Sequence, residues 1–253
     1  MKKIIKELPK RTKNPRKNGL TMMMDKGLSI RQAEDFLEVN HEITDIIKLG
    51  FGTSIITPRI SEKIKLYKNN GMLVYAGGTL FEAFAIRNQL DDYKRYINNI
   101  GLNMVEISDG SIDLDHMEKC EIITDFSKDF KVISEVGSKN PKSKISSDNW
   151  IKWIKEELCA GSWKVIAEAR EGGDIGICNK DGKIKSELIN EITNQIKQNK
   201  ILWESPSKNQ QLWFINKFGA NVNLGNIAPN EIISLECLRL GLRGDTLHNC
   251  INQ

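Results

Sequence analysis

The sequence has no long apolar run, no paired cysteine spacing and few histidines, and each absence excludes a class of protein. No stretch of the 253 residues approaches the length of a membrane span, and the basic N-terminus lacks the apolar segment of a secretory signal. The five cysteines show no CxxC spacing, which argues against disulfides and a cysteine zinc site. We therefore expect a cytoplasmic protein with no membrane contact, whose reduced, mostly buried thiols carry no chemistry.

Two further absences concern particular sites. No GxGxxG follows the first apolar run, so the phosphate-binding turn of dinucleotide-binding folds is missing. Of the three histidines, His41 precedes the second run, His116 lies in a helical pattern and His248 lies in the tail. Because none ends an apolar run, a histidine-based zinc site is disfavoured.

Eight short apolar runs are present instead, and nearly every one ends in a charged or amide residue followed by Gly, Ser or Pro. Helical patterns separate them, so a strand and a helix alternate every 20 to 36 residues. The count of eight favours a closed barrel over an open doubly wound sheet, and the length is typical of one such domain. We predict an α/β protein with a single-domain (β/α)8 TIM barrel. The runs cover residues 20–25, 45–52, 72–78, 104–110, 132–139, 165–173, 201–208 and 221–226.

Two helical patterns stand out. The apolar residues of 150–158 have helical spacing, with Ser147 and Asp148 before them as cap candidates. Those of 232–238 follow Pro229, a residue suited to the first turn of a helix. We expect the Trp and Ile residues of both patterns to lie in the core.

Two segments are harder to interpret. We place the eighth strand at residues 220–224, where Asn221 and Asn223 share parity and are expected to point amides into the barrel mouth. Residues 136–149 form the longest irregular exit. A segment of that length is either a lid or a surface loop.

The net charge of +4 is unevenly distributed. Residues 1–18 hold eight Lys and Arg against one acid, which leaves 32 acids against 29 bases in the rest of the chain. We predict a basic arm over residues 1–18 and the barrel domain over residues 19–253. Because the arm has no interleaved aromatic residues, we favour a solvated or subunit-covering arm over one that binds nucleic acid.

The polar residues that end the runs should meet at one rim of the barrel, where active sites of this fold lie. Strand parity makes Glu106 and Ser108 face inward together, and likewise Glu168 and Arg170. Asp25, Lys48, Glu135 and Glu204 close other strands, and Lys139 and Lys208 follow in two exits. Carboxylates without nearby His or Cys suit Mg²⁺, and the bases suit an anionic substrate. A structural salt bridge is the alternative for any one carboxylate, but not for the whole set.

Two glycine-containing turns are candidates for binding phosphate. Asn223-Leu224-Gly225-Asn226 runs into the helix at Pro229, at the strand where many barrels hold phosphate. Gly77-Gly78-Thr79 follows the third run, and glycine allows a ligand to approach the backbone closely. Tight turns also need glycine for their own geometry.

Nine motifs carry a family resemblance over nearly the whole chain. They are PRKNGLTMMMDKG (15–27), KLGFGTS (48–54), GGTLFEAF (77–84), VEISDGSI (105–112), SEVGSK (134–139), EAREGG (168–173), ESPSK (204–208), NVNLGNI (221–227) and LRGDTL (242–247). The set resembles the phosphosulfolactate synthase family, with Phe51 where Trp is common and Ser205 where Ala is common. Neither residue is charged, so neither departure affects the expected chemistry.

The resemblance implies a lyase that uses Mg²⁺ to add sulfite to C3 of phosphoenolpyruvate. The product is (2R)-phospho-3-sulfolactate, an early step toward sulfolactate or coenzyme M, and the family tends to self-associate, so we expect a homo-oligomer, as a trimer. It implies Lys139 as the acid that protonates C2, while Lys48, Arg170 and Lys208 neutralise substrate charge. The metal candidates are Glu106, Glu168, Glu135 and Asp25.

Two rival functions remain open. One is an aldolase-like barrel enzyme acting on a phosphorylated keto or enol substrate, for which Lys48 is the best-placed Schiff-base lysine. The other is a non-catalytic relative with a role in binding or stress protection. The roles of Arg243 and Asp245 are also open, between closing the rim, a subunit contact and a helix cap.

Overall fold

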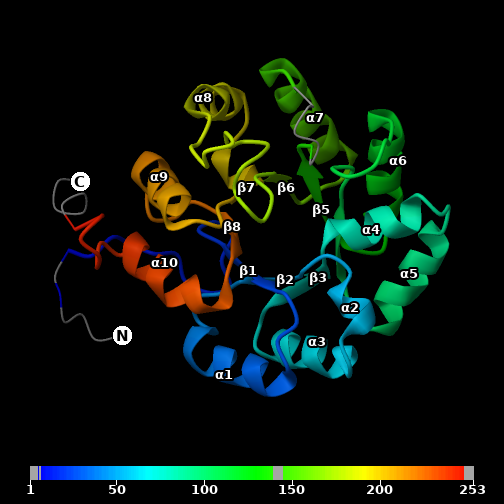
Figure 1. The fold of residues 1–253 in the computed structure, drawn as a ribbon, viewed down its shortest axis with the longest axis horizontal. Helices are drawn as coiled ribbons and strands as arrows, with labels where there is room; N and C mark the ends of the chain where they lie inside the picture. Colours follow the sequence, from blue (N-terminus) through cyan, green and yellow to red (C-terminus); the bar gives the residue numbers. More distant parts are fainter. Residues whose placement is uncertain (1–4, 6, 139–144, 248–253) are drawn as a thin grey trace.

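Eight parallel strands surrounded by helices form the chain, in a computed structural model that describes residue 5, residues 7–138 and residues 145–247 (Figure 1). The strand order is β3-β2-β1-β8-β7-β6-β5-β4, and β3 and β4 lie next to each other, so the sheet nearly closes into the predicted barrel. The strands are β1 (Thr21–Asp25), β2 (Ile46–Leu49), β3 (Leu73–Ala76), β4 (Met104–Ile107), β5 (Lys131–Val136), β6 (Lys164–Ala167), β7 (Ile201–Glu204) and β8 (Leu224–Ile227).

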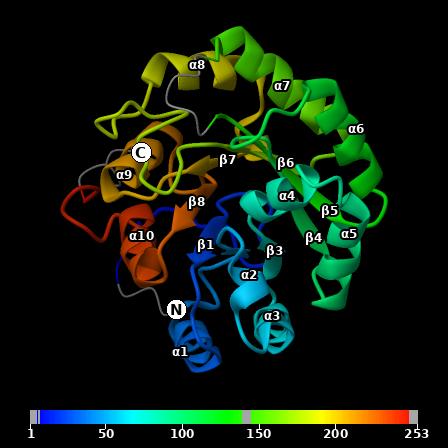
Figure 2. The ribbon, with the colours of Figure 1, turned by 45° about the vertical axis from the view of Figure 1, so that its right-hand side comes forward.

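Helices cover the outside of the barrel (Figures 1 and 2). They are α1 (Ile30–Asn40), α2 (Thr53–Ile56), α3 (Ile60–Asn69), α4 (Gly78–Ala85), α5 (Leu90–Asn99), α6 (His116–Phe126), α7 (Ser147–Ala160), α8 (Ser186–Gln195), α9 (Lys208–Phe218) and α10 (Ile232–Arg239), with 3₁₀ turns at Gln198–Lys200 and Pro229–Glu231. The α7 cap lies one residue before the predicted candidates, because the Ser146 side chain accepts the N–H of Asn149.

The alternation of side chains along the strands divides the core into two layers. One layer fills the barrel and includes Met22, Ile46, Ile133 and Leu202. A larger layer lies between the strands and the helices. The predicted core positions in α7 and α10 belong to this layer with two exceptions: Trp153 is only partly buried against it, and Ile233 is 50% exposed and lies at the surface.

Strand β8 lies further along the chain than predicted. Residues 220–224 were expected to form it, because Gly225 and Asn226 are typical of a turn. Gly225 instead lies inside the barrel, where an added Cβ would be 2.4 Å from Leu202 Cδ2 and 2.5 Å from Met22 Cε. Glycine is therefore needed there for packing.

Asn221 and Asn223 consequently lie at the opposite end of the barrel from the mouth, and the expectation that they face the mouth was wrong. The Asn223 side chain accepts the N–H of Leu20 at 3.1 Å and donates to the carbonyl of Ile201 at 2.8 Å. It therefore joins the beginnings of three strands.

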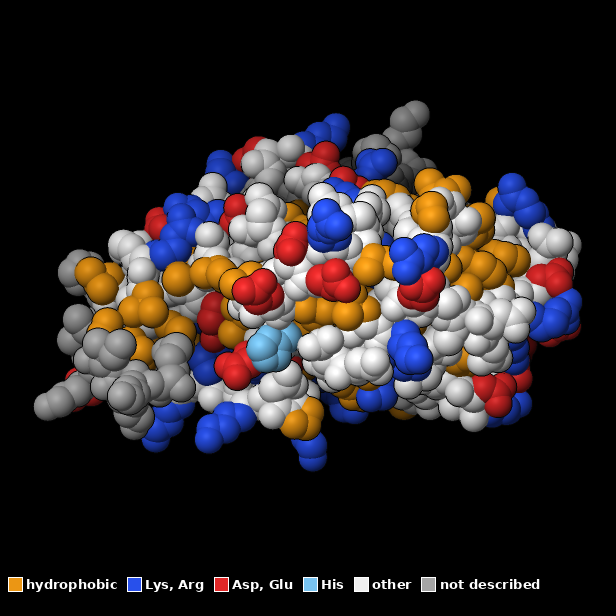
Figure 3. Space-filling view, turned by 90° about the horizontal axis from the view of Figure 1, so that it is seen from below, with side chains coloured by type: hydrophobic (Ala, Val, Ile, Leu, Met, Phe, Trp, Pro, Cys, Tyr) orange, Lys and Arg blue, Asp and Glu red, His pale blue; other side chains and the backbone are white. Residues whose placement is uncertain are grey.

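The N-terminal arm binds to this same end of the barrel. Arg11 forms an ion pair with Glu236 at 2.9 Å, and Arg16 forms one with Asp45 at 3.1 Å. These two cations are therefore held by the barrel. On the face shown in Figure 3, acidic and basic side chains are interspersed. Within the described residues, no helix is both long enough and apolar enough to span a bilayer.

Candidate active site

A cavity of about 260 Å³ opens at the C-terminal ends of the strands. It is lined by charged side chains from β2, β4 and β7 and from the ends of β5 and β6, together with Gly78 and Thr79 of α4. A larger cavity of about 620 Å³ lies outside the barrel, against α7 and α8. The charged residues that line this larger cavity, such as Lys180 and Glu187, are exposed to solvent. Of these two cavities, only the one at the barrel mouth is lined by buried charged residues. We therefore place the candidate site there.

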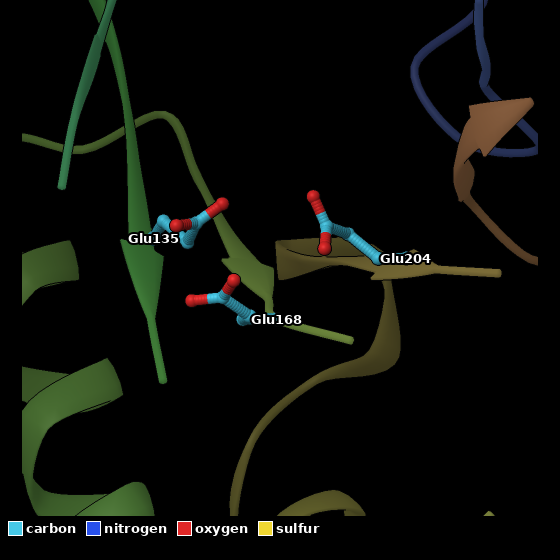
Figure 4. A group of neighbouring side chains, drawn as sticks. All are labelled: Glu135, Glu168 and Glu204. Carbon is cyan, nitrogen blue, oxygen red and sulfur yellow. The ribbon is translucent and has the colours of Figure 1, made fainter. Parts of the chain in front are cut away.

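Three glutamates converge at the mouth (Figure 4). Glu135 comes from β5, Glu168 directly follows β6 and Glu204 ends β7, and each has a carboxylate oxygen within 4.8 Å of those of the other two. All three are at most 2% exposed. At that separation two ionised carboxylates repel each other by roughly 3 kcal/mol at an effective dielectric constant of about 20. The group therefore calls for cations.

Lys48, on β2, supplies one of these cations. Its Nζ lies 3.1 Å from Glu106, 3.4 Å from Glu204 and 3.6 Å from Glu135. Burial alone would lower the pKa of Lys48, but the surrounding carboxylates, Glu106 first, raise that pKa well above its usual value. Lys48 therefore stays protonated at neutral pH and is a poor nucleophile.

The β4 exit confirms the predicted inward face. Glu106 contacts Lys48, and the Ser108 hydroxyl donates to Glu82 of α4 at 2.8 Å. A Cβ on Gly78 would lie 2.2 Å from Ser108 Oγ and 2.5 Å from Glu106 Oε1. Gly78 therefore allows α4 to begin directly against the cluster. Gly77 caps that helix, and its added Cβ would lie 3.0 Å from the Phe51 nitrogen.

Two other lining residues have strained backbones. Arg170 has a φ of 62° and Asn226 a φ of 58°, in the left-handed region that few residues other than glycine adopt. Arg170 is exposed at the mouth, whereas Asn226 is only 6% exposed. Such strain often occurs where backbone geometry serves a site. From the predicted phosphate turn, Asn226 is the residue that reaches the cavity.

Asp25 is not brought into the cluster. On β1 the neighbouring Met24 faces the mouth, so Asp25 points outward to α3, where it pairs with Lys63 at 2.8 Å and accepts from the Tyr67 hydroxyl at 3.0 Å. Its other oxygen accepts the N–H groups of Gly27 and Leu28. These contacts are those of a residue that holds the β1 exit in shape.

The remaining predicted residues lie elsewhere. Lys208 begins α9 and pairs with Asp245 at 3.1 Å, with both side chains partly exposed. Arg243 lies 3.9 Å from the same carboxylate, so this C-terminal segment is tied to the β7 exit. Lys139 lies outside the described residues, and its role stays a prediction.

Glu204 was absent from the predicted metal set although it is central to the cluster. It closes β7 as Glu135 nearly closes β5, and its Oε2 also accepts the N–H of Ala169 at 3.0 Å. The sequence did indicate Glu204 as a candidate. Three consecutive runs each have a glutamate at the point where their apolar residues end.

Comparisons with known proteins identify similar sequences over almost the whole chain. The family model described as (2R)-phospho-3-sulfolactate synthase (ComA) matches residues 9–245. A phosphosulfolactate synthase of Methanocaldococcus jannaschii is 44% identical over 235 residues, covering 90% of this chain and 93% of the relative. That of Bacillus subtilis is 40% identical over 243 residues, covering 95% and 96%.

A solved structure supports the fold alone. The YdjI aldolase of Escherichia coli K12 has a TM-score of 0.56 at 8% identity, covering 93% of this chain and 85% of that one. The family model and the close relatives go further and match almost the whole chain. The chain therefore belongs to the family of (2R)-phospho-3-sulfolactate synthases and is an enzyme of the lyase type.

Proposed function

We propose that this enzyme catalyses the Mg²⁺-dependent addition of sulfite to C3 of phosphoenolpyruvate, giving (2R)-phospho-3-sulfolactate. The observation that carries the proposal is the group of three buried glutamates at the barrel mouth beside a protonated lysine. The family supplies the product class, and this charge arrangement suits the reaction.

The donor set fits Mg²⁺. Glu135, Glu168 and Glu204 offer three carboxylate oxygens and no nitrogen or sulfur, which is the preference of a small hard cation. Among the described lining residues, these three glutamates, Glu106 and Glu171 outnumber the cations Lys48 and Arg170, so a divalent cation has an electrostatic reason to bind there. When bound, Mg²⁺ supplies Lewis-acid stabilisation of the negative charge that develops on the substrate carboxylate.

The protein must also bring two anions together. Sulfite attacks a molecule that already carries a phosphate and a carboxylate, and two unit charges 4 Å apart repel by about 4 kcal/mol at an effective dielectric constant of about 20. Of the two cations among the described lining residues, Arg170 is the exposed one, so it is suited to meet the incoming anions. Lys48 neutralises the inner wall.

The reaction ends with a proton on C2. As the sulfur–carbon bond forms at C3, the electrons of the double bond move toward C2 and the carboxylate, and a general acid then protonates C2. The raised pKa of Lys48 makes it a weak acid for this step. We therefore keep Lys139 as the proposed donor, on the strength of the family resemblance.

An aldolase-like reaction is the rival for the same cavity. A Schiff-base mechanism needs a neutral lysine amine, and the carboxylates around Lys48 favour its ammonium form instead. Borohydride reduction in the presence of a phosphorylated keto substrate tests this point. A stable mass increase located on Lys48 would favour the aldolase.

The direct test is ³¹P NMR of the purified protein with phosphoenolpyruvate and sulfite, first with Mg²⁺ and then with EDTA. We expect a new phosphate-ester resonance only when the metal is present. Unchanged phosphoenolpyruvate in the presence of folded protein and Mg²⁺ would reject the proposal. The same product in EDTA would reject its metal requirement.

The location and the oligomeric state of the enzyme are also open to test. We propose a cytoplasmic enzyme that acts as a homo-oligomer, with a trimer as the expected state. Light scattering coupled to size-exclusion chromatography gives the mass of the particle, and a mass of one chain would reject the oligomer.

A further inference from the structure

A buried lysine on α6 lies directly behind the acidic cluster. Lys119 is 1% exposed and lies outside the barrel wall. Its side chain extends from α6 toward α7 and the ends of β4 and β5. Its Nζ donates to the main-chain carbonyl of Glu135 at 2.6 Å. It also lies 2.8 Å from Asp109 and 2.7 Å from Glu157.

These three contacts join parts that the site depends on. Glu135 is one of the three converging glutamates, and Asp109 follows Glu106 by three residues in the β4 exit. Glu157 anchors the lysine to α7. The ammonium group donates hydrogen bonds to Asp109 and to the Glu135 carbonyl and forms an ion pair with Glu157, so its position is fixed from three sides.

We propose that Lys119 is a positioning residue that sets the placement of Glu135 relative to Glu168 and Glu204, and through it the affinity of the site for a divalent cation. Lys119 itself touches neither the metal nor the substrate. The inference rests on the metal site of the proposed function. Groups that orient metal ligands from behind commonly change metal affinity by about 10- to 100-fold when removed.

The competing explanation is that Lys119 and Glu157 form a buried ion pair that serves stability alone. The chain offers a matched control for it in Lys63, which is also 1% exposed. Lys63 pairs with Asp25 at 2.8 Å and donates to the carbonyl of Leu28 at 2.8 Å. Lys63 thus has the same chemistry behind β1, away from the three glutamates.

The test is calorimetric titration of Mg²⁺ into the wild type, K119M, K119M/E157Q and K63M, with the melting temperature of each. K119M leaves Glu157 without its cation, and the double variant removes that buried charge, so it should regain stability relative to K119M. We expect Mg²⁺ affinity to fall by about 10-fold or more in both Lys119 variants and to be unchanged in K63M. Wild-type affinity in the double variant would overturn the proposal, because stability would then explain every effect.

A further variant and a structure separate this proposal from the proposed function. E204Q removes one of the three proposed ligands and should abolish Mg²⁺ binding. If the wild type itself binds no Mg²⁺, the metal part of the proposed function fails. The crystal structure of K119M/E157Q then decides the positioning role: a Glu135 carboxylate displaced from Glu168 and Glu204 supports it, and an unchanged arrangement refutes it.

Discussion

Replacing Lys48 by methionine should destabilise the enzyme strongly. The ammonium lies 3.1, 3.4 and 3.6 Å from three buried carboxylates, and methionine fills the space without the charge. Removing one partner of a buried ion pair typically costs about 3–5 kcal/mol. For a chain of this length each kcal/mol lowers the melting temperature by roughly 2–4 °C. The expected loss is therefore about 6–20 °C, from the same two rules.

The pH dependence of this loss follows from the direction of the pKa shift. The folded-state pKa of Lys48 is raised above its unfolded value of 10.5, so its stabilising effect is complete below that value. The effect is lost only as the pH rises through the raised folded pKa. The difference in unfolding free energy between wild type and K48M should therefore be the same at pH 7 and at pH 9.

Urea denaturation followed by circular dichroism, in EDTA, measures this difference. K26M is the control, because Lys26 pairs with Glu171 at the same rim but both side chains are nearly half exposed. Such an exposed pair is worth about 0–1 kcal/mol. A K48M loss as small as that of K26M would refute the view that Lys48 balances the buried cluster.

Three other changes test separate parts of the site. Lys139→Met should abolish turnover but leave phosphoenolpyruvate binding largely intact, and near-normal rates would rule out Lys139 as the acid. Gly78→Ala places a methyl group 2.2 Å from Ser108 Oγ, so we expect kcat to fall by about 100-fold with little change in circular dichroism. Burial raises the pKa of Glu157 to about 7, against an opposing effect of Lys119. Wild-type stability should therefore fall relative to E157Q as the pH rises from about 4.5 to 7 and then level off, as denaturation at several pH values will show.

The sequence was sufficient to predict the barrel, because each strand is a short apolar run and each exit is polar. The same logic misplaced β8. Gly225 reads as a turn residue in isolation, but its missing side chain makes room for Leu202 and Met22 inside the barrel. A requirement that arises from residues on other strands has no local signature. Position along the chain was therefore predictable for the strands with large apolar residues and not for the one with glycine at its centre.

The candidate site was predictable to the extent that strand parity was followed. Parity placed Glu106 and Glu168 inward, as the structure has them. It was not applied to β1, where Met24 faces the mouth and Asp25 therefore faces α3. Glu204 was likewise within reach, since it ends the strand next to the one that carries Glu168. The role of Lys119 could not be predicted from the sequence, because its contacts depend on how α6 packs behind β5.

The positions of the buried lysines explain how a barrel can hold so many acids at one rim. Lys48 offsets the cluster from inside, while Lys63 and Lys119 bind the ends of strands from behind, each pairing with a carboxylate and donating to a main-chain carbonyl. The lysines behind the wall cannot neutralise a charge inside the cavity without losing their own partners. Among the described residues that line the cavity, five glutamates stand against two cations, Lys48 and Arg170, so the acids are in excess. Under the proposed function, a divalent cation bound there would offset that excess, and binding to the folded state alone would couple metal affinity to stability.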